Sequence, residues 1–330
     1  MMKYDSNSVA ARSSAVELWG GRLRRLMQSS VEWPGLLLPL KLMVLGLGLG
    51  LLKWTALRRY SPEIVTKRGL RLAGAPLDST LNAVVFYRGE FEPVLTQGLQ
   101  HWIQAGDVCV DAGANVGYFT LLMAKQVGTQ GKVIAIEAAP RNVLRIQRNL
   151  DVNAFHETHT QVVQVVHAAC AEQSAPITFY INRHNDMHCR LQPPKRSELD
   201  FWLMGGSKAW RPVEVSGRTF KDILGDDAAQ VSFIKLDIEG AEHHVVHDVL
   251  THCTHPKLKV AMEVKAPFIR ASLEGFEKMG FHLYDLRNNY QWLHSGTLHS
   301  LRPISFDQSY RSSFMLDVLV SRLALTSIAH

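Results

Sequence analysis

Cysteines are few in this sequence, and none of them are paired in a motif. The four cysteines, at positions 109, 170, 189 and 253, form no CxxC pair, and the first lies inside a predicted strand. This argues against a disulfide framework and a zinc cluster, and indicates reduced cysteines in a cytosolic setting. The sequence also lacks internal repeats and low-complexity tracts. Its 46% hydrophobic residues suffice for a full core.

Basic and acidic residues balance over most of the chain, so its net charge there is zero. Up to Tyr60 there are nine Lys or Arg and three Asp or Glu, whereas the remainder has 27 of each kind. A nucleic-acid groove on that remainder would need a basic face of its own, so we expect no nucleic-acid partner. We therefore separate a basic and apolar leader, residues 1–60, from a domain over residues 61–330.

One long apolar run, Gly35 to Leu52, lies in the leader and is flanked by basic residues. Pro39, Lys41 and three glycines weaken it as a membrane-spanning helix. We expect residues 22–59 to contact a membrane surface. A helix packed on the domain and a true span are the alternatives. No convincing small-residue cleavage site follows the run, which argues against a removed signal peptide.

The most informative segment begins at position 108 and reads VCVDAGANVGYFTLLMAKQVGTQGKVIAIE. An apolar run ends at Asp111, small residues follow, and Tyr118–Val127 has apolar residues at helical spacing. This pattern predicts a strand, a tight loop and a helix, with glycines where the backbone turns and a ligand comes close. A second predicted strand, Lys132–Ile136, ends in Glu137, 24 residues after Gly113. That position suits an acid that binds ribose hydroxyls.

Two details indicate which ligand the loop binds. A dinucleotide fingerprint has a glycine two positions after the first, where this chain has Asn115. Asp111, at the mouth of the loop, would repel a phosphate but suits a ligand with an ammonium and a cationic sulfur. S-adenosylmethionine has both and no phosphate, so we predict it as the cofactor. A nicotinamide-dependent oxidoreductase on a similar sheet is the alternative. The predicted cofactor-binding residues are Asp111, Gly113, Ala114, Asn115, Gly117, Glu137 and Ala138.

A second motif, FIKLDIEGAE, begins at Phe233. It predicts a strand that leads through Asp237 into the start of a helix. Ligands bind at this edge of doubly wound sheets, and a carboxylate that ends a buried strand needs a partner. Glu239 and Glu242 lie in the first turn of the predicted helix, where negative charge stabilises the helix end.

Together, DAGANVGYFT, GKVIAIEAAPRNVLRIQRNLDVN and FIKLDIEGAE resemble the FkbM family of S-adenosylmethionine-dependent methyltransferases, with a likeness from about Gly69 to Val320. The resemblance implies a Rossmann-like α/β fold: a seven-stranded class I methyltransferase sheet, mostly parallel with an antiparallel edge strand and helices on both faces. It also implies methylation of a hydroxyl on a small molecule, glycan or lipid-linked acceptor. The chain departs from the family at Ala138, where a proline usually stands. A methyltransferase-like scaffold without catalysis is a further alternative.

The rest of the chain supports this fold independently. Several more runs have strand character: 162–166, 177–181, 258–264, 282–286 and 314–320. Helical patterns lie between several strands: 141–153, 241–250 and 268–279. Strands that alternate with helices favour a mostly parallel sheet. The last two strands have no obvious helix between them, which favours an antiparallel strand at one edge.

An irregular segment, residues 182–211, interrupts the methyltransferase core that we assign to residues 89–320. It is rich in Pro, Gly, His and Trp, and long loops of this kind are often functional lids. We expect it to cover the methyl donor, while exposed polar residues and two packing tryptophans are the alternative. The candidate contacts and apolar walls are His184, Asp186, His188, Trp202 and Trp210.

Methyl transfer to a hydroxyl needs a base near the acceptor, and the candidates are Asp237 and His188. Alternatively, Asp237 and Glu263 bind a divalent cation that lowers the acceptor's pKa. We favour the metal-free version. His243 and His247 have the spacing of a helical metal pair but no third ligand, so we expect a solvated helix face. Because S-adenosylmethionine is cytosolic, the domain should lie in the cytoplasm or face it from a membrane-associated leader.

Overall fold

The structure is a computed structural model that describes residues 63–73, 80–155, 162–182, 189–190, 209–238, 241–286, 301–304 and 315–325. The chain forms two compact units, and among the described residues the boundary between them follows Phe91. Several predicted features lie outside the described residues: the leader segment 22–59, His184, Asp186, His188 and Trp202.

The first unit contains a hairpin and a helix. β1 (Ile64–Val65) pairs antiparallel with β2 (Arg71–Leu72), and α3 spans Thr80–Arg88. Lys67 and Glu90 form an ion pair at 2.6 Å. The expected start of the catalytic domain at residue 61 stays a prediction.

An eight-stranded sheet in the order β13-β12-β14-β11-β10-β3-β4-β5 forms the centre of the second unit. Its strands are β3 (Val108–Ala112), β4 (Lys132–Glu137), β5 (Val163–His167), β10 (Val231–Leu236), β11 (Lys259–Lys265), β12 (His282–Asp285), β13 (Arg302–Pro303) and β14 (Met315–Ser321). The run from β11 to β5 is parallel throughout, as predicted.

Two details of this sheet differ from the expectation. The sheet has eight strands rather than seven, because the two-residue β13 pairs with β12. The antiparallel strand β14 lies between β11 and β12 rather than at the edge. Sequence spacing does not fix this position, because β14 pairs with two strands that precede it in the chain.

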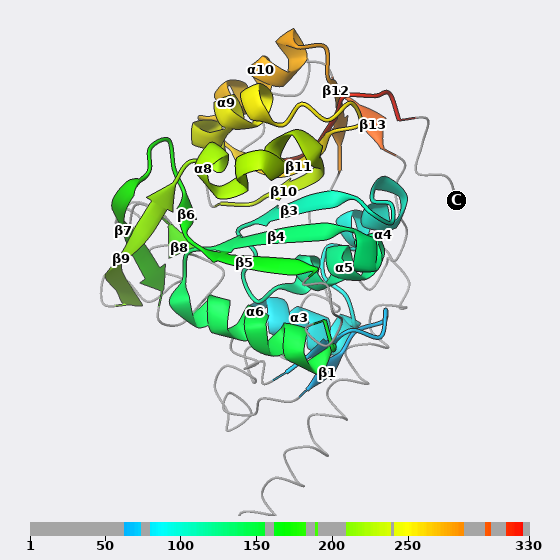
Figure 1. Cartoon of the computed structure of the whole chain (residues 1–330), viewed down its shortest axis with the longest axis vertical. Helices are drawn as coiled ribbons and strands as arrows, with labels where there is room; N and C mark the ends of the chain where they lie inside the picture. The colour runs from blue at the N-terminus through cyan, green and yellow to red at the C-terminus, as the bar shows by residue number, and fades with distance from the viewer. Residues whose placement is uncertain are drawn as a thin grey trace, which may run out of the picture. The chain divides into compact units, whose positions relative to one another are not determined.

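Helices cover both faces of this sheet (Figure 1). One face carries α4 (Pro93–Trp102), α5 (Tyr118–Val127) and α6 (Pro140–Val152), and the other carries α8 (Phe220–Leu224), α9 (Glu242–His252) and α10 (Ile269–Lys278). From the central pair β10 and β3, the chain runs toward one edge of the sheet through β3, β4 and β5. It runs toward the other edge from β10 to β11. Right-handed crossovers then put the helices on opposite faces. The predicted helices α5, α6, α9 and α10 are confirmed to within two residues at each end.

Side chains of β10 alternate between these faces. Ile234 and Leu236 are fully buried in an apolar core that includes residues of α8, α9 and α10. Phe233 points to the other face, where its ring stacks on Trp102 with centroids 6.2 Å apart. Lys235 shares that face, with its ammonium 5.2 Å from a ring centroid of α5. One face of the sheet is thus apolar, whereas the other also holds charge.

A separate four-stranded sheet has the order β6-β9-β7-β8. It consists of β6 (Ala169–Cys170), β7 (Ala175–Asn182), β8 (Cys189–Arg190) and β9 (Trp210–Arg218). The predicted strand 177–181 is confirmed but belongs to this sheet. Trp210 was expected in a loop, yet it begins β9 and is buried. A tryptophan that pairs in a strand can bury its ring against neighbours that a loop does not provide.

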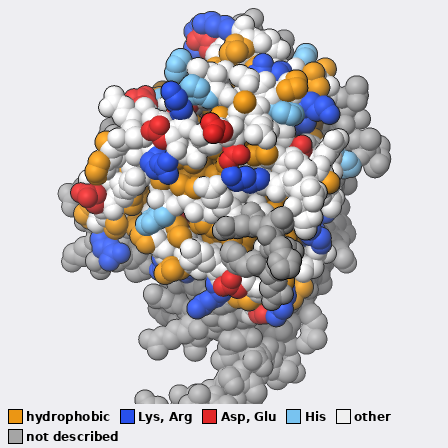
Figure 2. Space-filling model, viewed as in Figure 1, with side chains coloured by type: hydrophobic (Ala, Val, Ile, Leu, Met, Phe, Trp, Pro, Cys, Tyr) orange, Lys and Arg blue, Asp and Glu red, His pale blue; other side chains and the backbone are white. Residues whose placement is uncertain are grey.

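Basic and acidic side chains are interspersed over the described part of the face in Figure 2, in keeping with the even balance beyond Tyr60. Among the described residues, no helix has the length and apolar character needed to cross a membrane. The expected membrane contact of residues 22–59 and the expected lack of a nucleic-acid partner stay predictions.

Candidate functional site

The strand order of the central sheet reverses between β3 and β10, and the predicted acids lie there. Asp111 is next to last in β3, and Asp237 directly follows β10. The strands pair in parallel, with Asp111 opposite Lys235. In open α/β sheets, ligands bind at the carboxyl ends of strands where the order reverses. The structure therefore brings the two predicted motifs together at the expected edge.

The loop after β3 touches the end of β10. Gly113 has a φ of +78°, a conformation that L side chains rarely adopt. A Cβ added there would lie 1.8 Å from the carbonyl oxygen of Asp237, which is far inside contact distance. At Gly117, with a φ of +85°, a Cβ would lie 3.2 Å from a side-chain carbon of Ile146. Gly113 thus permits the approach of two strand ends.

Backbone hydrogen bonds tie the loop to the end of β4. The amides of Gly113 and Ala114 both donate to the carbonyl of Ile136 at 3.0 Å. Asn115 adopts a φ of +53°, and its amide donates to Glu137 Oε2 at 2.7 Å. The Oδ1 atom of Asn115 is buried and has no hydrogen-bond partner among the described residues. A buried oxygen in this state can accept a hydrogen bond from a ligand.

Glu137 links the loop to the start of α6. Its Oε1 accepts a hydrogen bond from the amide of Ala139 at 2.8 Å, in addition to the bond from Asn115. Burial raises the pKa of Glu137 to about 7, although these amides and Asn142 act in the opposite direction. The next residue, Ala138, is buried and uses its carbonyl to contact a ring nitrogen of His167 at 3.1 Å.

Asp111 lies beneath the loop rather than at its mouth. The residue has no exposed surface, and its Oδ2 accepts a hydrogen bond from the Thr120 hydroxyl at 2.6 Å. Its Oδ1 has no hydrogen-bond partner among the described residues, and the ammonium of Lys235 lies 3.9 Å away. Burial raises the pKa of Asp111, while Lys235 and Thr120 lower it. Asp111 is therefore buried rather than exposed at the mouth of the loop, and its role in cofactor binding stays a prediction.

Lys235 is the main residue that the sequence did not reveal. Its side chain is 6% exposed, and its Nζ lies 3.2 Å from Asp237 Oδ2. Burial alone would lower the pKa of Lys235, but the carboxylates of Asp237 and Asp111 outweigh burial and raise it. The signal was present: within FIKLDI, a charged residue occupies an interior position of an apolar strand.

Asp237 opens into a small hollow at the ends of β10, β11 and β14, and its side chain is 37% exposed. Glu263 lines the same hollow, as the sequence predicted for adjacent strand ends, and forms an ion pair with Lys265 at 2.8 Å. Burial, followed by the charges of Glu92, Glu263 and Asp237, raises the pKa of Asp317, which also lines the hollow. Glu92 and Lys235 also line the hollow, and the other walls are apolar: Leu95, Leu236, Ala261, Met262 and Leu286.

In the part of the chain that the structure describes, the candidate cation ligands Asp237 and Glu263 line one hollow, whereas His243 and His247 lie on α9. That part contains no group of three or more His, Cys, Asp or Glu side chains able to hold a metal ion. The His243 ring stacks on Phe268 with centroids 4.0 Å apart, while His247, one turn later, is exposed. His247 thus lies on a solvated helix face as expected, whereas His243 is half-buried against Phe268.

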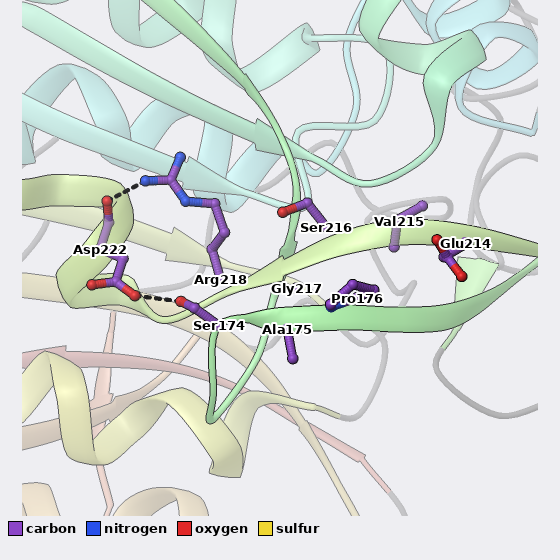
Figure 3. Close-up of a pocket in the computed structure, with 9 residues that line it drawn as sticks. All are labelled: Ser174, Ala175, Pro176, Glu214, Val215, Ser216, Gly217, Arg218 and Asp222. Carbon is purple, nitrogen blue, oxygen red and sulfur yellow. Dashed lines mark hydrogen bonds between the residues drawn. The ribbon is translucent and has the colours of Figure 1, made fainter.

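A larger hollow of about 710 Å³ lies on the small sheet beside α8 (Figure 3). Its polar groups bond mainly with one another: Ser174 donates to the carboxylate of Asp222, and Arg218 donates to the carbonyl of the same residue. None of the predicted site residues lines it. The edge of the central sheet therefore stays the candidate site.

Comparisons with known proteins agree with this geometry. Residues 111–283, more than half of the chain, match the Methyltransferase FkbM domain family. "Methyltransferase 1" from Beauveria bassiana is 26% identical over 145 residues, which cover 42% of this chain and 56% of that protein. The chain thus matches only about half the length of this relative.

Two solved structures were also found to be similar to this chain. An FkbM methyltransferase from Methylobacillus flagellatus is 17% identical, with 65% of this chain and 43% of that chain covered and a TM-score of 0.34. A SAM-dependent O-methyltransferase from Thermotoga maritima is 12% identical, with 80% and 78% covered and a TM-score of 0.38.

We expect Gly113→Ala to destabilise the protein more than a matched glycine substitution. Gly128 also has a positive φ, of +65°, but an added Cβ would meet no atom within 4 Å. Gly128→Ala should cost about 1 to 3 kcal/mol, the cost of its sparsely populated backbone conformation (φ 65°, ψ −167°) alone. Gly113→Ala should cost at least about 2 kcal/mol more, because the backbone at Asp237 must move. Urea unfolding of both variants measures the difference, and equal losses would contradict the contact.

Glu137 should make stability depend on pH. Its pKa is about 7 in the folded protein against an ordinary value of 4.5. Between these values the folded state binds more protons than the unfolded state, so the free energy of unfolding falls as pH rises. In Glu137→Gln this decline should be smaller, by an amount on the order of 3 kcal/mol. Urea unfolding from pH 4.5 to 7.5 tests this, and the same decline in both proteins would refute it.

Proposed function

Because the chain belongs to the Methyltransferase FkbM domain family, we propose that it is an S-adenosylmethionine-dependent methyltransferase. We further propose that it methylates a hydroxyl group on a small molecule, a glycan or a lipid-linked acceptor. The observation that carries the proposal is the contact between Gly113 and Asp237. This contact joins a glycine loop that suits a nucleoside ligand to a partly exposed carboxylate. That carboxylate can take the proton from an acceptor hydroxyl.

The residues of the loop fit S-adenosylmethionine. The carboxylate of Glu137 accepts two backbone hydrogen bonds and one from the Asn142 side chain, and a carboxylate has roughly four lone-pair sites, so about one is left for a ribose hydroxyl. Asn115 Oδ1 offers a further buried acceptor. Asp111 acts from beneath the loop through its charge, while Gly113, Ala114, Gly117 and Ala138 keep the backbone close to the ligand.

The acceptor side requires a base and a dry surface. When bound, S-adenosylmethionine supplies an electrophilic methyl group on a cationic sulfur. Asp237 accepts the proton that the acceptor hydroxyl loses, and its partly exposed carboxylate faces a hollow lined by both charged and apolar side chains. By holding the acceptor there, the chain gains rate through orientation. His188 stays a second candidate base outside the described residues.

A divalent cation held by Asp237 and Glu263 is the alternative to direct proton transfer. Both carboxylates line the same hollow, which suits oxygen ligation. We favour the metal-free version because Lys235 and Lys265 already pair with these two carboxylates.

Calorimetric titration tests the cofactor. We expect saturable binding of S-adenosylhomocysteine and none of NADH, with Glu137→Ala at least tenfold weaker because a charged hydrogen-bond acceptor is worth about 1.5 to 3 kcal/mol. Glu172→Ala is the matched control, since this exposed glutamate pairs only with His244 at 2.6 Å among the interactions described. Binding of NADH instead would favour an oxidoreductase. A folded protein that binds neither ligand would favour an inactive scaffold.

Transfer to a hydroxyl is tested with labelled S-adenosylmethionine and hydroxylated acceptors. Once an acceptor is found, Asp237→Asn should lower turnover about 10²-fold or more, because the proton acceptor is lost. Its affinity for S-adenosylhomocysteine should stay near that of the wild type. Turnover that survives the substitution would remove Asp237 from the mechanism, and loss of turnover on addition of EDTA would favour the cation.

A further inference from the structure

Lys235 occupies an unusual place for a lysine, inside a parallel sheet. The side chain is 6% exposed, and its two strand neighbours, Ile234 and Leu236, are fully buried apolar residues. Removing an ammonium from water costs free energy unless anions compensate. Two carboxylates are within reach, those of Asp111 on the adjacent strand and Asp237 two residues later.

The distances show which carboxylate Lys235 serves. Its Nζ lies 3.2 Å from Asp237 Oδ2, within hydrogen-bond reach, but 3.9 Å from Asp111 Oδ1. Asp111 already accepts a hydrogen bond from Thr120 at 2.6 Å. If Lys235 only neutralised Asp111, its ammonium should lie within hydrogen-bond distance of Asp111 Oδ1. That oxygen has no hydrogen-bond partner among the described residues. Instead the ammonium reaches toward the more exposed carboxylate.

The surroundings of Asp237 explain why a cation is needed. Three other carboxylates line the same hollow: Glu92 before α4, Glu263 on β11 and Asp317 on β14. Like charges at short range favour uptake of a proton, and a protonated Asp237 could not act as a base. Lys265 pairs with Glu263 at 2.8 Å, which leaves Lys235 as the cation bonded to Asp237 in the described lining.

We propose that Lys235 is the positioning residue of the site, which holds Asp237 ionised and turned toward the hollow while it connects that carboxylate to Asp111 under the glycine loop. The inference rests on the proposed function, because it gives Asp237 the role of proton acceptor. Lys235 itself touches no substrate in this scheme and acts through Asp237.

The test observes Asp237 directly, in protein without cofactor. Carboxyl-labelled aspartate is incorporated, the Asp237 signal is assigned by its loss in Asp237→Asn, and its titration is followed by carbon-13 NMR. In Lys235→Met the titration midpoint should rise by about one to three pH units, the usual effect of removing a nearby opposite charge. Lys132→Met is the matched control, since it removes a lysine paired with Asp227 at 2.6 Å. An unchanged midpoint in Lys235→Met overturns the proposal.

A double variant guards against misfolding, because Lys235→Met leaves Asp111 buried without its cation. Asp111→Asn combined with Lys235→Met removes both charges, and the raised midpoint of Asp237 should persist. A return to the wild-type midpoint would mean that Lys235 only neutralises Asp111. S-adenosylhomocysteine binding by the wild-type sample is measured alongside. Its absence contradicts the proposed function, whereas the titration decides the role of Lys235.

Discussion

The approach of Gly113 to the carbonyl oxygen of Asp237 is the contact on which the rest of the site depends. An added Cβ would come within 1.8 Å of that oxygen, so the two strand ends can meet only through a glycine. They meet where the strand order reverses, and the helices after these strands leave on opposite faces. The edge between them is left open, as in other doubly wound sheets. The glycine loop and the carboxylate-bearing Asp237, from distant parts of the chain, thereby lie side by side.

The two faces of the sheet differ in what they contribute. The face under α8, α9 and α10 is apolar and supplies most of the described core. The face toward α5 carries Asp111 and Lys235 as opposite partners on adjacent strands. Buried ion pairs add little to stability compared with apolar packing, so their presence favours a role in function. Side-chain exposure increases from the fully buried Asp111 through Lys235 to the partly exposed Asp237. Lys235 therefore links the buried carboxylate of Asp111 to the carboxylate at the hollow.

Local sequence patterns predicted the helices and strands well, but they predicted less well which strands pair with one another. The helical spacing after Gly117 gave α5 its bounds, and the alternation in FIKLDI gave β10 its position. The run 177–181 was a correct strand but joined the small sheet, and β14 was inserted between β11 and β12. Strand pairing is a choice among distant segments of similar composition, and it depends on which backbone groups and apolar faces remain to be covered.

The glycine loop, the acid at or near the end of each strand and the family to which these motifs point could be predicted from the sequence alone. Backbone conformation and strand ends follow from neighbouring residues, so short motifs carry them. Three features of the site emerge only from the tertiary fold: Asp111 is fully buried, Lys235 donates a hydrogen bond to Asp237, and Glu137 accepts one from the loop amide of Asn115. These facts depend on burial and on the register between strands, and both arise when segments far apart in the chain exclude water from the same place.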